Sequence, residues 1–295
     1  MEPICVTYRA PLDGELRACL VKRLIQYLLF MRGQIPCLYG DLLQFVENYK
    51  LQQQGQSGGP RRKRLPMGGG IKKAVKCVDA SELLFLERLD AIFSLRVKRV
   101  ALVFGPSIMS PREVHVVDFT AVQGRISDAE SPTTASPDTD GEDMSLEDSQ
   151  TLLPPSPPMT REKLMRLCAQ KLMRAVFTNA VEQFSSALSA TKLHVAVLAE
   201  RQLTRIPGFL PKQQFKLRLP KDKNGARTHY ITISDGLDSS EQAFECTNNP
   251  ENGSSKASHS VDNGAEVSAD ANFVWYLLEQ PIPGFSEVIN TLDSH

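Results

Sequence analysis

Residues 99–119, RVALVFGPSIMSPREVHVVDF, contain two apolar runs separated by a turn sequence. Every residue from Val100 to Phe104 is apolar, which is typical of a short strand buried on both faces. After the turn at Gly105, Val114 and Val116 alternate with their neighbours, and this period of two predicts a second strand. The stretch therefore predicts a hairpin whose first strand lies at the centre of a sheet.

The turn between the two runs lacks the features of a reactive loop. A phosphate-binding loop needs a glycine-rich backbone that leads into a helix, whereas Pro106 removes an amide and a strand follows. A nucleophile elbow needs Gly-x-Ser-x-Gly, which is absent around Ser107. Ser107 is therefore predicted to be a turn residue, and His115 to be a half-exposed structural residue. A hydrolase with His115 as its general base is a less favoured alternative.

Four segments show the apolar spacing of three and four residues that is typical of helices. The first covers residues 14–31, and we expect Pro36 to end it. The others cover residues 38–49, 72–96 and 159–188. The last is the longest, and it begins at Thr160 with Lys163 in the position where a capping box has Glu or Gln.

The longest predicted helix has two apolar sides. One side comprises Leu164, Cys168, Leu172, Ala175 and Val176, and the other Met173, Phe177, Ala180, Phe184 and Leu188. This arc is wider than one packed face requires. Two interpretations remain open: the helix is central and buried all round, or part of the Met173 side stays exposed to receive a partner.

Further strands are predicted at residues 192–200, 214–220 and 228–234, and a last one at 272–281. The segments 214–220 and 228–234 alternate apolar and polar residues, as half-buried antiparallel strands do.

Three polar segments interrupt these elements and lack the apolar residues that a core needs. We predict a basic flexible loop at 52–73, an acidic Ser/Pro-rich disordered linker at 124–160, and a disordered insert at 236–270. The remaining divisions of the chain are N-terminal helices (1–51), a helix with the hairpin (74–123), the long helix with strands (161–235), and a C-terminal strand and tail (271–295).

Two of these segments contain candidate regulatory signals. The basic loop carries a cluster that is either a nuclear-import signal or a solvated charge run: Arg61, Arg62, Lys63 and Arg64. The acidic linker carries Ser-Pro pairs at Ser131, Ser136 and Ser156, which are candidate sites for proline-directed phosphorylation.

Composition restricts the possible partners of the 295-residue chain. Lys plus Arg and Asp plus Glu each number 34, so no overall charge favours nucleic acid or an anionic membrane. No apolar stretch reaches the roughly 20 residues of a membrane span, and we expect a soluble intracellular protein. The six cysteines show no metal-ligand spacing, and we expect them to be reduced structural thiols.

The order of elements and several stretches resemble the comet family of HORMA-like adaptors. These stretches are FMRGQIPCLYGDLLQF, VKRVALVFGPSIMSPREVHVVDF, KLMRAVF, GFLPKQQFKLRLP and NFVWYLLEQPIPGF. The resemblance covers nearly all the predicted ordered segments. It implies a HORMA-like α+β fold in which three helices pack on one antiparallel sheet and the C-terminal strands form a closed safety belt.

The resemblance also implies an adaptor rather than an enzyme, with no cofactor, metal or catalytic residues. Comet proteins bind the closed conformer of the Mad (mitotic arrest deficient) spindle-checkpoint protein and present it to a hexameric AAA+ ATPase of the thyroid-receptor-interactor type. By position, Met31, Met173 and Phe177 correspond to the Mad interface, and Pro211 and Lys212 to the ATPase-facing pair.

Such adaptors silence the spindle assembly checkpoint in mitosis, so the expected location is the nucleus, the cytoplasm and the mitotic spindle. Neither nucleic acid nor membrane is an expected partner. The alternative is another HORMA-type scaffold, one that captures a partner peptide in chromosome-axis or repair complexes.

Overall fold

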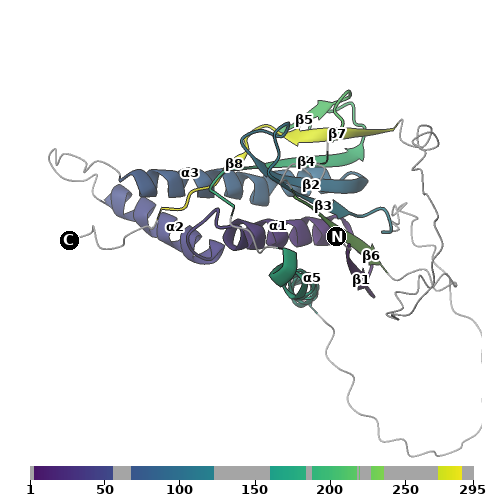
Figure 1. Cartoon of the computed structure of the whole chain (residues 1–295), viewed down its shortest axis with the longest axis horizontal. Helices are drawn as coiled ribbons and strands as arrows, with labels where there is room; N and C mark the ends of the chain where they lie inside the picture. The colour runs from purple at the N-terminus through teal and green to yellow at the C-terminus, as the bar shows by residue number, and fades with distance from the viewer. Residues whose placement is uncertain are drawn as a thin grey trace, which may run out of the picture.

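The chain folds into a mixed β-sheet with helices on one of its faces (Figure 1). The computed structural model describes residues 3–55, 68–122, 160–183, 188–217, 219, 227–235 and 272–287. The predicted α+β class is therefore confirmed. Among the described residues, no helix combines the length and apolarity that a membrane span requires.

In the described part of the chain, the sheet has eight strands in the order β1-β6-β3-β2-β4-β7-β5, with β8 pairing on β4. Their bounds are β1 Ile4–Tyr8, β2 Val97–Gly105, β3 Glu113–Asp118, β4 Lys192–Glu200, β5 Phe209–Lys212, β6 Arg227–Asp235, β7 Phe273–Leu278 and β8 Ile282–Pro283.

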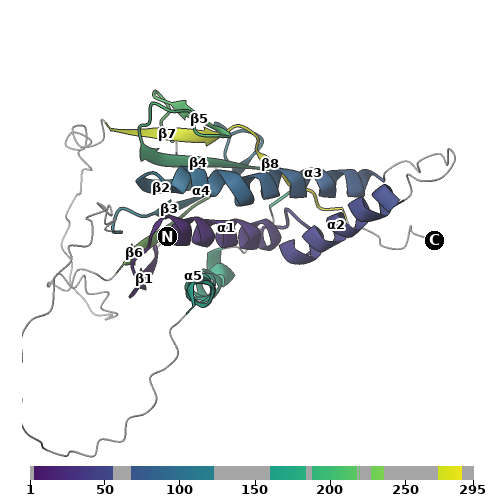
Figure 2. The same ribbon diagram turned by 180° about the vertical axis from the view of Figure 1, so that it is seen from behind.

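The described helices are α1 (Gly14–Met31), α2 (Tyr39–Gly55), α3 (Gly69–Leu83), the π-helical segment η2 (Leu84–Arg88), α4 (Leu89–Phe93) and α5 (Arg161–Gln183). The segments α3, η2 and α4 follow one another without a break. In the view from behind, α4 lies against α1 and α2 lies against α3 (Figure 2).

The hairpin predicted from residues 99–119 is confirmed. Strands β2 and β3 pair antiparallel, and β2 lies between β3 and β4 inside the sheet. A Cβ on Gly105 would lie 2.5 Å from the Ser110 carbonyl oxygen, so the turn requires glycine there. One detail was wrong: His115 is 1% exposed rather than half-exposed, because β3 is covered on both faces.

The sheet is mixed and not antiparallel, which corrects the predicted fold class. Strand β6 runs parallel to both of its neighbours, β1 and β3. The predicted half-burial of β6 is correct, since His229, Ile231 and Ile233 are buried on alternate positions. Alternation reports burial of one face and carries no information on strand direction, which the connections decide.

The strand predicted at 214–220 is wrong for the described residues. The chain turns after β5, where the Phe215 amide donates to the Lys212 carbonyl at 3.2 Å, and no ladder follows through Leu217. Phe215 instead meets Trp275 edge to face, and Leu217 packs on the sheet face opposite the helices. The apolar alternation of this segment therefore reflects packing of Phe215 and Leu217 on the sheet and not strand pairing.

Strand β1 was not predicted. Ile4, Val6 and Tyr8 are buried while Cys5 and Thr7 are exposed, so the segment has the period of an edge strand. The run is only five residues long and stands alone at the start of the chain, which is why the pattern was missed.

The other predicted bounds shift at the ends of elements. Helix α2 continues to Gly55, and α3 begins at Gly69, so both ends of the predicted flexible loop 52–73 are helical. The helix predicted at 72–96 ends at Phe93 and contains the π-helical η2. The strand predicted at 272–281 corresponds to β7, which ends at Leu278, and the short strand β8 follows beyond the predicted range.

Helix α1 covers the predicted residues, but Pro36 does not end it. Gly33 adopts φ 62°, and its amide donates to the Phe30 carbonyl at 2.9 Å while the Gln34 amide donates to Leu29 at 2.8 Å. This is a left-handed glycine cap, and it turns the chain three residues before the proline.

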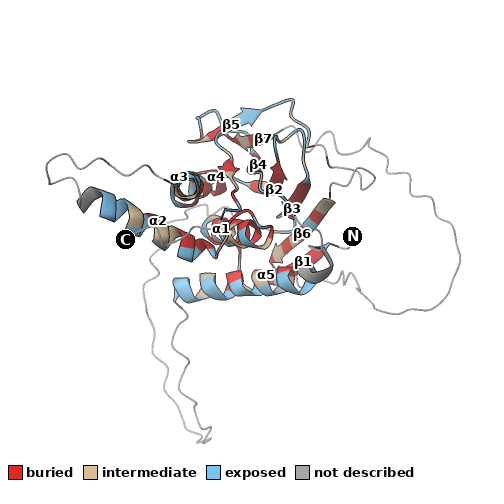
Figure 3. Cartoon of the chain, turned by 60° about the vertical axis from the view of Figure 1, so that its left-hand side comes forward, coloured by how far each residue is buried: buried red, intermediate tan, exposed pale blue. Residues whose placement is uncertain are grey.

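Helices cover one face of the sheet, and Figure 3 shows the buried residues gathered between the two layers. The main core joins α1, α3, α4 and α5 to β2 residues such as Leu102 and Phe104. The opposite sheet face has a small second cluster that includes Val103, Val114 and Ala196.

Candidate functional site

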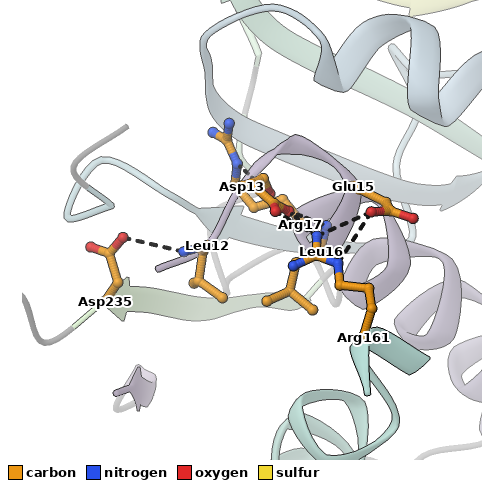
Figure 4. A network of polar contacts seen from close by, with 7 residues as sticks. All are labelled: Leu12, Asp13, Glu15, Leu16, Arg17, Arg161 and Asp235. Atoms are coloured by element: carbon orange, nitrogen blue, oxygen red, sulfur yellow. Dashed lines mark hydrogen bonds and ion pairs between the residues drawn. The ribbon is translucent and has the colours of Figure 1, made fainter. Parts of the chain in front are cut away.

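The start of α5 is fastened to the start of α1 by a polar network (Figure 4). Asp13 caps α1 by accepting from the Leu16 amide at 2.9 Å. Arg161, the first residue of α5, donates from Nη2 to Asp13 Oδ1 at 2.6 Å and to Glu15 Oε2 at 3.1 Å. One guanidinium thus joins two helix starts, because Asp13 caps α1 and Glu15 lies in its first turn.

Strand β1 holds the middle of α5. The Tyr8 hydroxyl donates to the Cys168 carbonyl at 3.0 Å, and Lys171 Nζ donates to the Thr7 carbonyl at 2.5 Å. Burial raises the pKa of Tyr8 above its usual range, so its phenol remains a donor. The unpredicted strand therefore helps to position α5 on the domain, together with α1.

Helix α5 has one buried side and one exposed side (Figure 3). The buried side includes Cys168, Ala169, Leu172 and Val176. Phe177 is 58% exposed and Leu167 is 44% exposed, so the interpretation of a helix buried all round is wrong. Of the side predicted to stay open, Phe177 is exposed, whereas Met173 packs partly against the core.

Met31, the last residue of α1, is half-buried. Its neighbour Phe30 is 37% exposed and was not predicted as a contact residue. The available signal was its position outside the apolar period of α1, which predicts exposure. Gln34 Nε2 donates to the Leu188 carbonyl at 3.4 Å, which places the end of α1 beside the chain that leaves α5. Met31, Met173 and Phe177 therefore belong to two helices that pack on each other.

Pro211 and Lys212 lie elsewhere, on the exposed part of the edge strand β5. They border an open groove of about 570 Å³ whose apolar lining includes Ile108, Met109 and Phe215. Because β1 and β5 are opposite ends of the sheet order, this pair is remote from the side on which α5 packs.

A buried ionic network lies where α1 ends above β3. Arg32 Nε donates to Glu113 Oε1 at 2.8 Å and its Nη2 donates to Glu113 Oε2 at 2.6 Å. His115 Nε2 lies 2.7 Å from the same Glu113 Oε1, and His229 stacks on His115 with ring centroids 4.6 Å apart. These four residues are at most 3% exposed. Sequence reasoning missed the network because Arg32 and His229 lie far from Glu113 and His115 in the chain.

The network perturbs the acidity of its members. Burial alone raises the pKa of Glu113, but hydrogen bonds and charge from His115 and Arg32 outweigh it and lower the pKa to about 2. Burial and the neighbouring His115 lower the pKa of His229 to about 4. Glu113 is therefore ionised and His229 neutral near neutral pH.

Glu113, His115 and His229 bring three potential metal-ligand atoms within 4.8 Å of one another. However, both carboxylate oxygens of Glu113 already accept from the Arg32 guanidinium. A divalent cation at this position would be repelled by that positive charge and would have to displace it. The donor set fits a salt-bridged structural network better than a metal centre. Burial also keeps His115 away from any substrate.

Several predicted sites lie outside the described residues. These are the basic cluster Arg61, Arg62, Lys63 and Arg64, and the Ser-Pro serines Ser131, Ser136 and Ser156. The described cysteines, Cys5, Cys19, Cys37, Cys77 and Cys168, are free thiols, as predicted. Burial raises the pKa of Cys77 to about 12, so this thiol is unreactive.

Comparisons with known proteins do not assign the chain to a family. No protein-family model matches the chain, and no curated protein matches it at the significance required.

The buried ion pair yields a stability prediction. Arg32→Met or Glu113→Gln should each lower the free energy of unfolding by about 3–5 kcal/mol, because each leaves the other group's charge buried without its partner. The double variant should lose less than the sum of the two. Urea denaturation of the four proteins measures this coupling. The exposed pair Lys50 and Asp79, with side chains 46% and 54% exposed, is the control and should couple by under about 1 kcal/mol.

Acidification should destabilise the fold in two stages. The pKa of His229 is about 4 in the folded chain and 6.5 in the unfolded chain. As the pH falls below 6.5, the unfolded chain therefore binds a proton on His229 that the folded chain does not yet bind, so the free energy of unfolding falls. Below pH 4.5 the unfolded chain protonates Glu113 before the folded chain does, and the fall continues toward pH 2. Denaturation at a series of pH values measures both stages. His229→Gln should remove much of the first stage, and an unchanged slope between pH 6.5 and 4.5 would contradict this assignment.

Proposed function

We propose that the chain is a HORMA-like adaptor of the comet type. In this proposal it binds the closed conformer of the Mad spindle-checkpoint protein and presents it to a hexameric AAA+ ATPase, which silences the checkpoint. The observation that carries the proposal is the exposed apolar surface of α5, where Phe177 is 58% exposed on a helix whose other side is buried in the core. A large exposed aromatic residue on an ordered helix is typical of an interface anchor.

The docked C-terminal segment supports an adaptor over a scaffold that captures foreign peptides. The Gly284 amide donates to the Thr191 carbonyl at 2.7 Å, and the Phe285 amide donates to the Gln34 carbonyl at 2.7 Å. Phe285 is 3% exposed, and Glu287 pairs with Lys73 of α3. A scaffold that wraps a partner peptide needs this segment to open, whereas an adaptor works with it closed.

Conformer-selective binding explains why an ATPase is part of the proposal. A protein that binds only closed Mad stabilises that conformer by at most its difference in affinity for the two conformers. Opening of Mad therefore needs free energy from elsewhere, which ATP hydrolysis by the partner supplies. Separate surfaces for the two partners support this role, since α5 and the β5 edge lie toward opposite ends of the sheet.

Phe177→Glu should weaken binding of closed Mad at least tenfold, because it places a charge at the centre of the proposed interface. Calorimetry with a conformer-locked Mad measures the dissociation constant. Leu51→Glu is the matched control, since Leu51 is 64% exposed but lies on α2. Full affinity in the Phe177 variant would exclude α5 as the Mad-binding surface.

The double variant Pro211→Ala/Lys212→Ala should keep the affinity for closed Mad and slow ATP-driven opening severalfold. The reason is that both residues lie on β5, away from α5. A reconstituted assay of Mad conversion with the ATPase gives the rate. Conversion at the unaltered rate would remove these residues from the ATPase contact.

A further inference from the structure

We propose that the outward side of α5 binds a protein segment whose carboxylates surround an apolar contact. We call this side the basic stripe, and it comprises Lys163, Arg166, Leu167, Gln170, Arg174 and Phe177. Consecutive members are mostly three or four residues apart, so they share one side of the helix. The inference rests on the proposed use of α5 as the partner-binding surface and adds the chemistry of what binds there.

The cations of the basic stripe lack acidic partners. Lys163, Arg166 and Arg174 are exposed, and within the described part of the chain none of them makes an ion pair. By contrast, Arg161 at the start of the same helix binds two acids. Three exposed positive charges on one helix side attract carboxylates and steer an acidic segment toward the helix.

Apolar side chains lie among these charges. Leu167 is 44% exposed and lies between Arg166 and Arg174 along the stripe. Phe177 is 58% exposed and follows Arg174. From Lys163 to Phe177 the stripe extends about 21 Å at 1.5 Å per residue. This length suits a partner helix or strand that places acidic residues around one or two apolar side chains, since apolar anchors supply affinity and charges supply orientation.

A membrane surface fits the stripe less well. Membrane-bound amphipathic helices keep a continuous apolar face for the acyl region, with cations on the opposite face. The continuous apolar face of α5 is already buried against the core through Leu172 and Val176, which are 0% and 1% exposed. Nucleic acid fits less well because Phe177 is the one aromatic residue of the stripe, and base stacking needs a platform.

The test uses a triple charge reversal with a matched control. Lys163→Glu/Arg166→Glu/Arg174→Glu alters the stripe, and Lys72→Glu/Arg96→Glu/Arg201→Glu makes the same charge change at exposed positions elsewhere. The probes are closed Mad and a synthetic helical peptide in which glutamates flank two leucines. The stripe variant should bind each probe at least tenfold more weakly than the control variant, and added salt should weaken binding to the wild type more than to the stripe variant.

The two probes separate failure of this inference from failure of the proposed function. If closed Mad does not bind the wild type but the acidic peptide binds through the stripe, the Mad proposal fails and this inference holds. If closed Mad binds the stripe variant and the control variant equally, the basic stripe does not contribute to Mad binding. The inference then fails, whereas the proposed adaptor function stands. Circular dichroism and urea denaturation of both variants exclude unfolding as the cause of any loss.

Other occupants of the stripe give distinct results, each of which would overturn the proposal. Binding to phosphatidylserine vesicles more tightly than to the acidic peptide would indicate a membrane surface. A dimer that only the stripe variant disrupts would indicate a second copy of the chain.

Discussion

The bidentate pair between Arg32 and Glu113 is the interaction on which the arrangement of helices and sheet depends. It lies where α1 ends and β3 begins, and both side chains are at most 3% exposed. Two buried opposite charges tolerate little displacement, because any separation leaves each of them desolvated and uncompensated. The pair therefore determines where the end of α1 lies on the sheet, while the stacked His115 and His229 extend the network to β6.

Gln34 carries this constraint from α1 to two later parts of the chain. Its Oε1 accepts from the Thr191 amide at 2.7 Å, just before β4, and its carbonyl accepts from the Phe285 amide at 2.7 Å near the C-terminal end of the described residues. The exit of α5 and the C-terminal segment are thus both tied to the turn that follows α1. Together with Arg161 at the other end, these contacts hold α5 as an ordered surface with its outward side open.

The position of the candidate surfaces follows from the sheet order. Strands β1 and β5 form its two edges, α5 packs on β1, and Pro211 and Lys212 lie on β5. A protein that joins two partners needs contact surfaces that do not compete for the same space. The two candidate surfaces meet that requirement because they lie toward opposite ends of the sheet order.

The sequence alone determined the parts of the fold that depend on local burial patterns. These include the β2–β3 hairpin and the bounds of α1 and β4, whereas the exposure of Phe177 was left open between two interpretations of α5. Only the tertiary structure decided the parallel direction of β6, the role of β1, and the meeting of Arg32 with Glu113. The physical reason is that periodicity records which side of an element is buried, whereas strand direction and buried ion pairs depend on which distant segments come together.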